Sequence, residues 1–275
     1  MRDQDELRLL TDRDGVPLPD AVGAFGVDLD RATGARRQLE GTAAYLELHI
    51  EQGPVLESMD LPLGVVLGTF GVERHQITWR GQAAHAGSTP MDKRRDGLAG
   101  AARLELEIRE IANRTGNGAV CTMGGVVTRP GIVTSVVETA ECLLDQRHLD
   151  ANQLAEMLSN AEAASRRFAQ EEDIEVEWER ICNIQPILFD EALIELADDS
   201  IREVTGESHR LPSGPLHDAA EVARAGVPTV MLFVQSLRGL SHTPLEDTKP
   251  EHLELSVQTL DRLASKTIAR VAAVS

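Results

Sequence analysis

The alternation of hydrophobic and polar residues in the middle of the chain predicts a compact α/β unit. His75, Ile77 and Trp79 alternate with polar neighbours, which is the period of a half-buried strand. Residues 92–112 carry apolar side chains at helical spacing and predict an amphipathic helix. Two strands over 119–128 and 136–146, a helix over 154–168 and a strand from Ile174 follow. The order βαββαβ is typical of a ferredoxin-like unit, with two helices on one face of an antiparallel sheet.

The segments on either side of this unit also alternate between strand and helix patterns. Apolar runs predict strands at 43–50, 61–71 and 229–234, and Asp190 is a candidate N-cap of a helix through Val204. A last helix is predicted after Pro250. We therefore expect one α/β domain made from both ends of the chain, residues 1–72 and 188–275, interrupted by an inserted domain over residues 73–187.

Composition and charge exclude several classes of protein. The 45 acidic against 27 basic residues give a formal charge of −18, which would repel a nucleic-acid backbone. No apolar run approaches the roughly 20 residues that span a bilayer, so we expect no membrane insertion. The cysteines Cys121, Cys142 and Cys182 form no CxxC pair, which disfavours a disulfide framework and a thiolate zinc site. A cytoplasmic protein is expected.

Two histidines lie where metal ligands commonly occur. His49 ends a predicted strand in LHIEQGP, and His242 lies in the loop GLSHTPLED between a strand and a helix. Neutral imidazole is a frequent ligand of zinc and manganese, and strand ends of α/β sheets often carry sites. Each histidine could equally be satisfied within or near the core, so spacing alone leaves both interpretations open.

Three further residues each have a functional and a structural interpretation. His85, in a loop of small residues, could stabilise an oxyanion or belong to a turn capped by Ser88 and Thr89. Arg147 could hold a carboxylate or form a surface ion pair with Asp145 or Asp150. His217 begins a predicted helix after a Gly-Pro loop, where the free backbone N–H groups favour an anion. In the structural interpretation, Asp218 simply caps this helix.

Five segments together carry a family resemblance. They are YLELHIEQGPVLE, GQAAHAGSTPMDKRRD, LLDQRHLDA, LPSGPLHDAAEVA and GLSHTPLED. In this order they resemble the M20-type amidohydrolases of the N-carbamoyl-L-amino-acid hydrolase, allantoate amidohydrolase and beta-ureidopropionase group. The resemblance runs over essentially the whole chain. It implies a Zn-peptidase-like catalytic α/β domain with an inserted lid that also forms a homodimer interface.

The resemblance also implies residue roles. His49 and His242 match histidines that bind one metal each in a site for two divalent ions, zinc or manganese. His85 matches the lid histidine that reaches the partner subunit's reaction centre. Arg147 matches the arginine that grips the substrate carboxylate, and His217 matches a substrate-contacting histidine. The implied reaction is hydrolysis of a C–N bond, other than a peptide bond, in a small carbamoyl or ureido compound that carries a carboxylate.

Some positions depart from the family pattern. Leu216 stands where the family commonly has glycine and is expected to narrow the pocket, and Thr134 replaces an asparagine. The family's HxD motif and Glu-Glu pair are not found among the 48 residues before His49. Because two histidines cannot hold two metal ions without the bridging carboxylate, we expect an incomplete site and an inactive chain that lacks roughly the family's first third.

Two other hypotheses remain open at this point. The chain could be a non-catalytic protein that dimerises through its inserted domain, since that domain can bury its own core. It could also be a related aminoacylase or aminopeptidase of the same fold. The residues of the segments HIEQGP and AHAGSTPM resemble the amidohydrolase group more than these enzymes.

Overall fold

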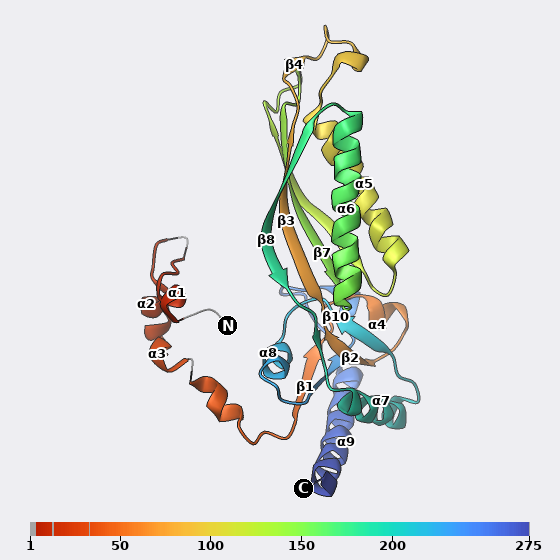
Figure 1. The fold of residues 1–275 in the computed structure, drawn as a ribbon. Helices are drawn as coiled ribbons and strands as arrows, with labels where there is room; N and C mark the ends of the chain where they lie inside the picture. The colour runs from red at the N-terminus through yellow and green to blue at the C-terminus, as the bar shows by residue number, and fades with distance from the viewer. Residues whose placement is uncertain (1–3, 13, 33, 275) are drawn as a thin grey trace.

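The computed structural model describes residues 4–12, 14–32 and 34–274 and contains two principal sheets (Figure 1). The basal sheet has the order β1-β11-β2-β10, and β9 also pairs with β2. The distal sheet has the order β5-β7-β3-β8. Each sheet packs its own helices, so the chain builds two hydrophobic cores. The mixed α/β architecture confirms the predicted fold class.

The basal sheet combines strands from both ends of the chain. Its strands are β1 (Tyr45–Ile50), β2 (Leu63–Thr69), β9 (Ile187–Leu188), β10 (Arg210–Ser213) and β11 (Thr229–Val234). Strand β11 runs parallel to β1 and antiparallel to β2, so the sheet is mixed. Helices α7 (Glu191–Thr205) and α9 (Pro250–Val274) pack against it, and Val65, Leu232 and Ile201 are fully buried between them. Burial of these side chains is the main stabilising term of this layer.

The distal sheet carries two long helices on one face. Its strands are β3 (Gly71–Arg80), β5 (Val120–Arg129), β7 (Thr139–His148) and β8 (Glu175–Ile184), all antiparallel. Helices α5 (Gly97–Thr115) and α6 (Ala151–Glu171) cover the face that buries Trp79, Ile108 and Met157. The predicted order βαββαβ is confirmed. A short pair, β4 (Ala84–His85) with β6 (Ser135–Val136), lies at the far tip of this sheet (Figure 1).

Several predicted boundaries differ from the structure in detail. The helix predicted from residue 92 begins at Gly97, because the Asp96 side chain accepts the Leu98 N–H and caps it there. Residues 91–93 form the separate 3-10 turn η2 (Met91–Lys93), and its N-cap Pro90 has no capping side chain. Ser88 and Thr89, considered as caps in the structural interpretation of the His85 loop, therefore do not cap this 3-10 turn. By contrast, Asp190 caps α7 through the Leu193 N–H at 2.9 Å, as predicted.

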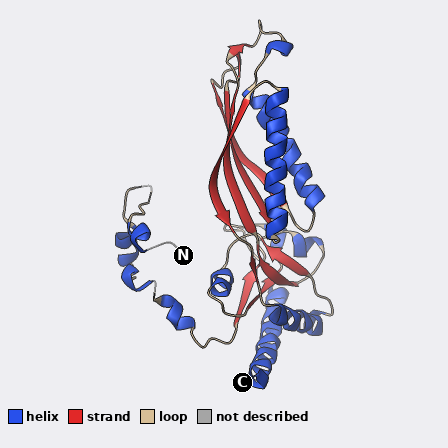
Figure 2. Cartoon of the chain, in the orientation of Figure 1, coloured by secondary structure: helices blue, strands red, loops and turns tan. Residues whose placement is uncertain are grey.

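Two short crossovers join the sheets. Strand β2 continues through Phe70 into β3, and β8 returns through Gln185 and Pro186 to β9. The first described residues form α1 (Gln4–Arg8), α2 (Leu18–Gly23), α3 (Leu29–Ala32) and η1 (Ala35–Leu39), which lie apart from both sheets (Figure 2). The connection from β1 to β2 contains α4 (Val55–Ser58), and α8 (Asp218–Arg224) and η3 (Leu237–Gly239) flank β11. No helix within the described ranges has the length and hydrophobicity needed to cross a membrane.

Candidate active site

His49 lies near the carboxyl end of β1, beside the last residues of β11. Its Cα pairs with Phe233 in the parallel ladder, and the two rings are 6.5 Å apart. The Nδ1 atom lies 2.6 Å from the carbonyl oxygen of Ile50. Since a carbonyl oxygen can only accept, Nδ1 donates to it. Nε2 is therefore the nitrogen of His49 through which the neutral ring would bind a metal.

His217 is the residue that the fold brings closest to His49. The centroids of the two rings are 4.3 Å apart with an interplanar angle of 63°. The Ser213 hydroxyl donates to the carbonyl oxygen of Pro215 at 2.9 Å and lies 2.7 Å from Nε2 of His217. Because the hydroxyl has one proton to donate, it accepts from Nε2. Burial, and after it the neighbouring His49, lowers the pKa of His217 from 6.5 to about 4, so the ring is neutral at neutral pH.

The N-terminus of α8 is satisfied by Glu47 and not by Asp218. His217 is the N-cap residue and Asp218 is the first residue of the helix. The Glu47 carboxylate, from β1, accepts the Ala219 N–H at 2.8 Å. The interpretation of Asp218 as the cap is therefore wrong, because a carboxylate from the neighbouring strand already binds the free backbone donor there.

Arg147 connects the two sheets. It projects from β7, where Nε and Nη2 donate to the two carboxylate oxygens of Asp145 at 2.6 and 3.1 Å. Its Nη1 donates to the carbonyl oxygen of Gly214, in the loop between β10 and α8, at 3.0 Å. Of the two ion pairs considered from the sequence, the structure shows the one with Asp145. Arg147 thus lies at the same loop that carries His217.

The loop of His242 is fastened to the HIEQGP loop. His242 is exposed and has a positive φ of 57°. Its backbone N–H donates to Glu246 at 2.9 Å, and the Gln52 side chain donates to the other oxygen of the same carboxylate at 2.8 Å. The Gln52 backbone N–H also donates to the Ser236 hydroxyl at 2.9 Å. These bonds hold the loop that follows His49 against the loop that contains His242.

His85 lies away from this group within the chain. It belongs to β4 at the tip of the distal sheet, at the opposite end from β1 and α8 (Figure 1). Its Nδ1 accepts the backbone N–H groups of Gly87 and Ser88 at 3.1 and 3.2 Å. The exposed ring therefore carries its proton on Nε2 and can donate a hydrogen bond outward. The carbonyl oxygen of Thr134 accepts from the Ala86 N–H at the same tip.

The described residues do not fit a complete metal centre. Among them, no three His, Cys, Asp or Glu side chains gather closely enough to hold an ion. The carboxylates nearest to His49 in the chain are already engaged, since Glu47 caps α8 and Glu51 accepts the N–H groups of Val55 and Leu56. Burial raises the pKa of Glu51, against those two hydrogen bonds. His49 and His242 can each offer one ligand, which is fewer than a zinc ion needs from its protein.

A cavity of about 1070 Å³ lies between the two sheets beside Arg147. Its walls come from β7, from the loop before β5, from the HIEQGP loop and from residues 209–212, 214 and 215. Apolar lining residues include Leu67, Phe70, Pro212 and Phe233. Leu216 was expected to narrow this space, but it is not among the described lining residues and is 48% exposed. Pro215 lines the cavity in its place, because the loop turns Leu216 outward.

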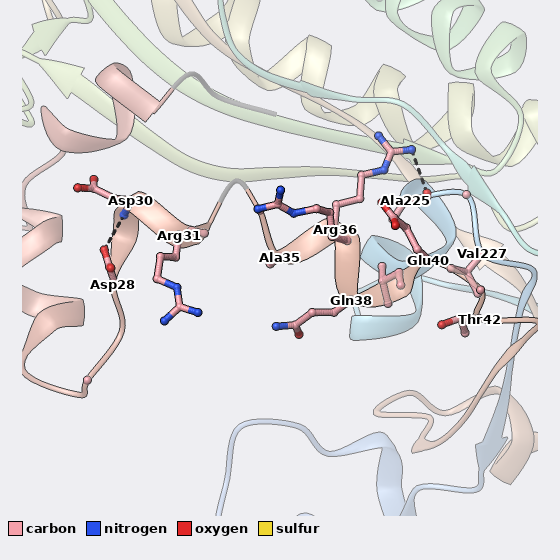
Figure 3. A pocket seen from close by; sticks show the side chains of 17 residues that line it. Asp28, Asp30, Arg31, Ala35, Arg36, Gln38, Glu40, Thr42, Ala225 and Val227 are labelled. Carbon is pink, nitrogen blue, oxygen red and sulfur yellow. Dashed lines mark hydrogen bonds between the residues drawn. The ribbon is translucent and has the colours of Figure 1, made fainter.

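A second hollow, of about 1100 Å³, lies under the N-terminal segment (Figure 3). It is lined by residues 26, 28, 30–32, 34–42 and 225–227. The Arg36 guanidinium donates to the carbonyl oxygen of Ala225 at 3.1 Å and ties the segment to the end of α8. None of the predicted site residues lines this hollow, so the cavity beside Arg147 is the candidate site.

Some residues of the site were not assigned a role from the sequence. Ser213 fixes the ring of His217, Glu47 fixes the start of α8, and Phe233 packs against both His49 and His217. Glu47 shares the parity of His49 in the strand, a signal that its side chain lies on the same face. The contact between Ser213 and His217 depends on the loop conformation, which the sequence pattern does not reveal.

Comparisons with known proteins agree with one another. Residues 25–266 match the description "Peptidase family M20/M25/M40". The chain is 35% identical to an N-carbamoyl-L-amino acid amidohydrolase of Geobacillus stearothermophilus, over 90% of this chain and 60% of that protein. It is 34% identical to the allantoate amidohydrolase of Escherichia coli K12, over 93% of this chain and 62% of that protein.

Solved structures give the same result. A hydantoinase/carbamoylase family amidase from Burkholderia multivorans superposes with a TM-score of 0.84 at 30% identity, over 96% of this chain and 63% of that one. A second amidase of that description, from Burkholderia phymatum, gives a TM-score of 0.82 at 29% identity, over 98% and 64% of the two chains. The chain thus spans about three fifths of the length of the relatives that it matches.

Proposed function

The chain belongs to peptidase family M20/M25/M40, and from this premise we propose that it serves the hydrolysis of a C–N bond in a linear amide or amidine. The substrates that we propose are N-carbamoyl-L-amino acids or allantoate, the compounds named in its amidohydrolase relatives. The observation that carries the proposal is the meeting of Arg147 and the His217 loop at one cavity. The loop reaches the cavity through Gly214 and Pro215, and Arg147 supplies there the carboxylate-binding cation that a small acidic amide requires.

We propose the following division of roles. Arg147 binds the substrate carboxylate, and the neutral ring of His217 contacts the carbamoyl or amidine end. His85, with its proton on the outward Nε2, donates to the tetrahedral oxyanion in a second copy of the chain. His49 and His242 each offer one nitrogen to a divalent ion, zinc or manganese. The described residues do not complete that centre, so no step is assigned to it.

The inserted part of the chain fits a lid in this scheme. We propose that residues 73–187 form the lid and dimerisation domain, and that residues 1–72 and 188–275 form the catalytic part. The separate hydrophobic cores of the two sheets support this division. The free thiols of Cys121, Cys142 and Cys182 support a reducing compartment such as the cytoplasm.

The test is a comparison between this chain and a chimera. The chimera joins the part of the Geobacillus relative that precedes its matched region to this chain. With zinc or manganese added, the chimera is expected to release the carbamoyl group from N-carbamoyl-L-amino acids or to hydrolyse allantoate. This chain alone is expected to be inactive, because its described residues gather no complete metal centre.

A variant and a set of other substrates make the test specific. The substitution Arg147→Gln in the chimera should raise KM for the carboxylate substrate by at least about tenfold, since a charge-assisted bidentate contact contributes more than about 1.4 kcal/mol. Preferred cleavage of N-acetyl amino acids or dipeptides would favour the aminoacylase or aminopeptidase alternative. A folded, dimeric chimera that cleaves none of these compounds would favour the non-catalytic alternative.

A further inference from the structure

The carboxylate of Asp145 joins two arginines on one strand pair. Arg147 donates to both of its oxygens through Nε and Nη2, and Arg74 donates to Oδ2 through Nε at 2.7 Å. Asp145 and Arg147 are two residues apart in β7 and therefore point from the same face of the strand. Arg74 is directly opposite Asp145 in β3. We call Arg74, Asp145 and Arg147 the arginine-aspartate triad.

The triad lies on the face of the distal sheet that α5 and α6 do not cover. Leu144, Gln146 and His148, which alternate with its β7 members, are buried on the helix side. Asp145 and Arg147 retain only 25% and 26% side-chain exposure, and both line the cavity between the sheets. The ion pair is thus sheltered, which strengthens it relative to an exposed surface pair.

The hydrogen bonds of Arg147 leave a defined part of its guanidinium free. Of the five N–H donors of a guanidinium, Nε–H and one N–H of Nη2 go to Asp145, and one N–H of Nη1 goes to Gly214. One N–H on each terminal nitrogen remains, which is the number that a bidentate carboxylate accepts. Two arginines and one aspartate also leave one net positive charge beside the cavity.

The charge of Asp145 is maintained in this setting. Burial by itself would raise the pKa of Asp145, but the hydrogen bonds from Arg147 and Arg74 outweigh burial and hold that pKa below its ordinary value. The Asp145 carboxylate therefore stays ionised at neutral pH. Asp145 is held by its own strand β7 and by Arg74 of β3. Its carboxylate therefore fixes the orientation of the Arg147 side chain.

We propose that Asp145 is a positioning residue that holds Arg147 with its remaining N–H donors available to a ligand carboxylate in the cavity. Arg74 restrains Asp145 from the neighbouring strand. Its positive charge balances the negative charge of Asp145, so that the charge of Arg147 remains available to the ligand. The inference rests on the proposed function, since it assigns Arg147 to the carboxylate of the substrate. It also unites the ion-pair and carboxylate-binding interpretations of Arg147, because the ion pair uses a different part of the guanidinium.

The experiment measures binding to the full chain by calorimetry, without turnover. The ligands are N-carbamoyl-L-alanine and its carboxamide, which differ only in the carboxylate. The wild-type chain is expected to bind the carboxylate at least about tenfold more tightly, as one charge-assisted pair provides. Asp145→Asn should abolish this preference while leaving affinity for the carboxamide unchanged. Asp145→Glu should restore part of it.

A matched control lies on the same strand. Glu141 in β7 accepts from Arg129 at 2.5 Å, in another cross-strand ion pair that does not line the cavity. Glu141→Gln should keep the full preference for the carboxylate. Thermal unfolding of each variant shows whether it is folded. If Asp145 had only a general structural role, Asp145→Asn would weaken the binding of both ligands by the same factor.

The outcomes separate this inference from the proposed function. An Asp145→Asn chain that keeps the preference for the carboxylate would overturn the positioning role and leave the proposed function standing. A lost preference in Asp145→Asn, together with an inactive chimera, would support the positioning role against the proposed reaction. A wild-type chain that binds neither ligand, or binds both equally, would overturn the positioning role.

Discussion

Asp198 shows how a single buried carboxylate holds part of the basal layer together. Its side chain is 1% exposed in α7, and it forms ion pairs with Arg202 at 2.6 Å and with Arg210 of β10 at 2.8 Å. Burial alone would raise the pKa of Asp198, but the hydrogen bonds from Arg210 and the charges of both arginines lower it. The charged form of Asp198 is therefore more favourable in the folded protein than in the unfolded chain.

The pH dependence of this residue can be predicted in sign. Because the folded pKa lies below the ordinary value of 3.8, the stabilisation by Asp198 is present above that value and is lost as pH falls through the folded pKa. Asp198→Asn should cost about 2 to 3 kcal/mol in the free energy of unfolding at pH 7, less than for a fully buried pair because both arginines are partly exposed. Urea unfolding at pH 7 and pH 3 measures both values.

Asp199 provides the control at this scale. Its side chain is 61% exposed and lies 3.8 Å from Arg202, so Asp199→Asn should change stability by less than about 1 kcal/mol. The Asp198→Asn variant should also lose less stability than the wild type between pH 7 and pH 3. An equal loss in both proteins would show that Asp198 is not responsible for the acid sensitivity.

At the scale of elements, the two crossovers between the sheets depend on close backbone approach. A Cβ atom built on Gly71 would lie 2.7 Å from the Pro186 ring and 2.9 Å from the Leu154 side chain. At Gly68, where φ is +147°, a Cβ atom would lie 2.2 Å from the carbonyl oxygen of Ile187. Both glycines therefore allow the outgoing and returning segments to touch where the distal sheet leaves the basal sheet.

This contact predicts a strong effect of one methyl group. Gly71→Ala should lower the free energy of unfolding by about 1 to 3 kcal/mol, because the added carbon overlaps a rigid proline ring. Gly124→Ala in β5 is the matched control, since it has no atom within 4 Å of the added carbon and should have an effect below about 1 kcal/mol. Chemical denaturation of both variants compares them, and equal effects would contradict a packed crossover.

The periodic elements were predictable because burial imposes a period on the sequence. The strand from Gly71 and the helix α6 have one buried face each, so their apolar residues recur at spacings of two and of three to four. The apolar spacing from residue 92 predicts α5 five residues too early, because the hydrogen bond from the Leu98 N–H to Asp96 that fixes its start forms only in the folded loop. The small β4 and β6 pair carries too few residues to show a period.

At the scale of the whole molecule, the sequence singles out candidate site residues but not how they are arranged in space. His49, His217 and Arg147 come from separate segments, and only the parallel pairing of β1 with β11 and the turn after β10 bring them to one region. Such contacts depend on tertiary structure, which local patterns do not encode. The roles proposed for His49, His85, Arg147, His217 and His242 stay predictions until they are tested.

The position of His85 leads to the last prediction, a homodimer. Within one chain, the tip that carries His85 lies at the opposite end of the distal sheet from β1 and α8 (Figure 1). Its proposed role in catalysis therefore requires a second copy. The strands β5 and β8 form the edges of the distal sheet, and Val127 on β5 is 56% exposed. An accessible edge strand with apolar side chains is suited to pairing with another chain.

Light scattering coupled to size exclusion should give a mass about twice the 29.9 kDa of the chain. Val127→Lys should shift the mass toward that of the monomer, because a charged side chain would be buried against the partner's edge. Ile268→Lys on α9, where Ile268 is 70% exposed outside the distal sheet, should leave the dimer intact. A wild-type chain that is monomeric at tens of micromolar would contradict the dimer, and with it the contribution of His85 from a second copy.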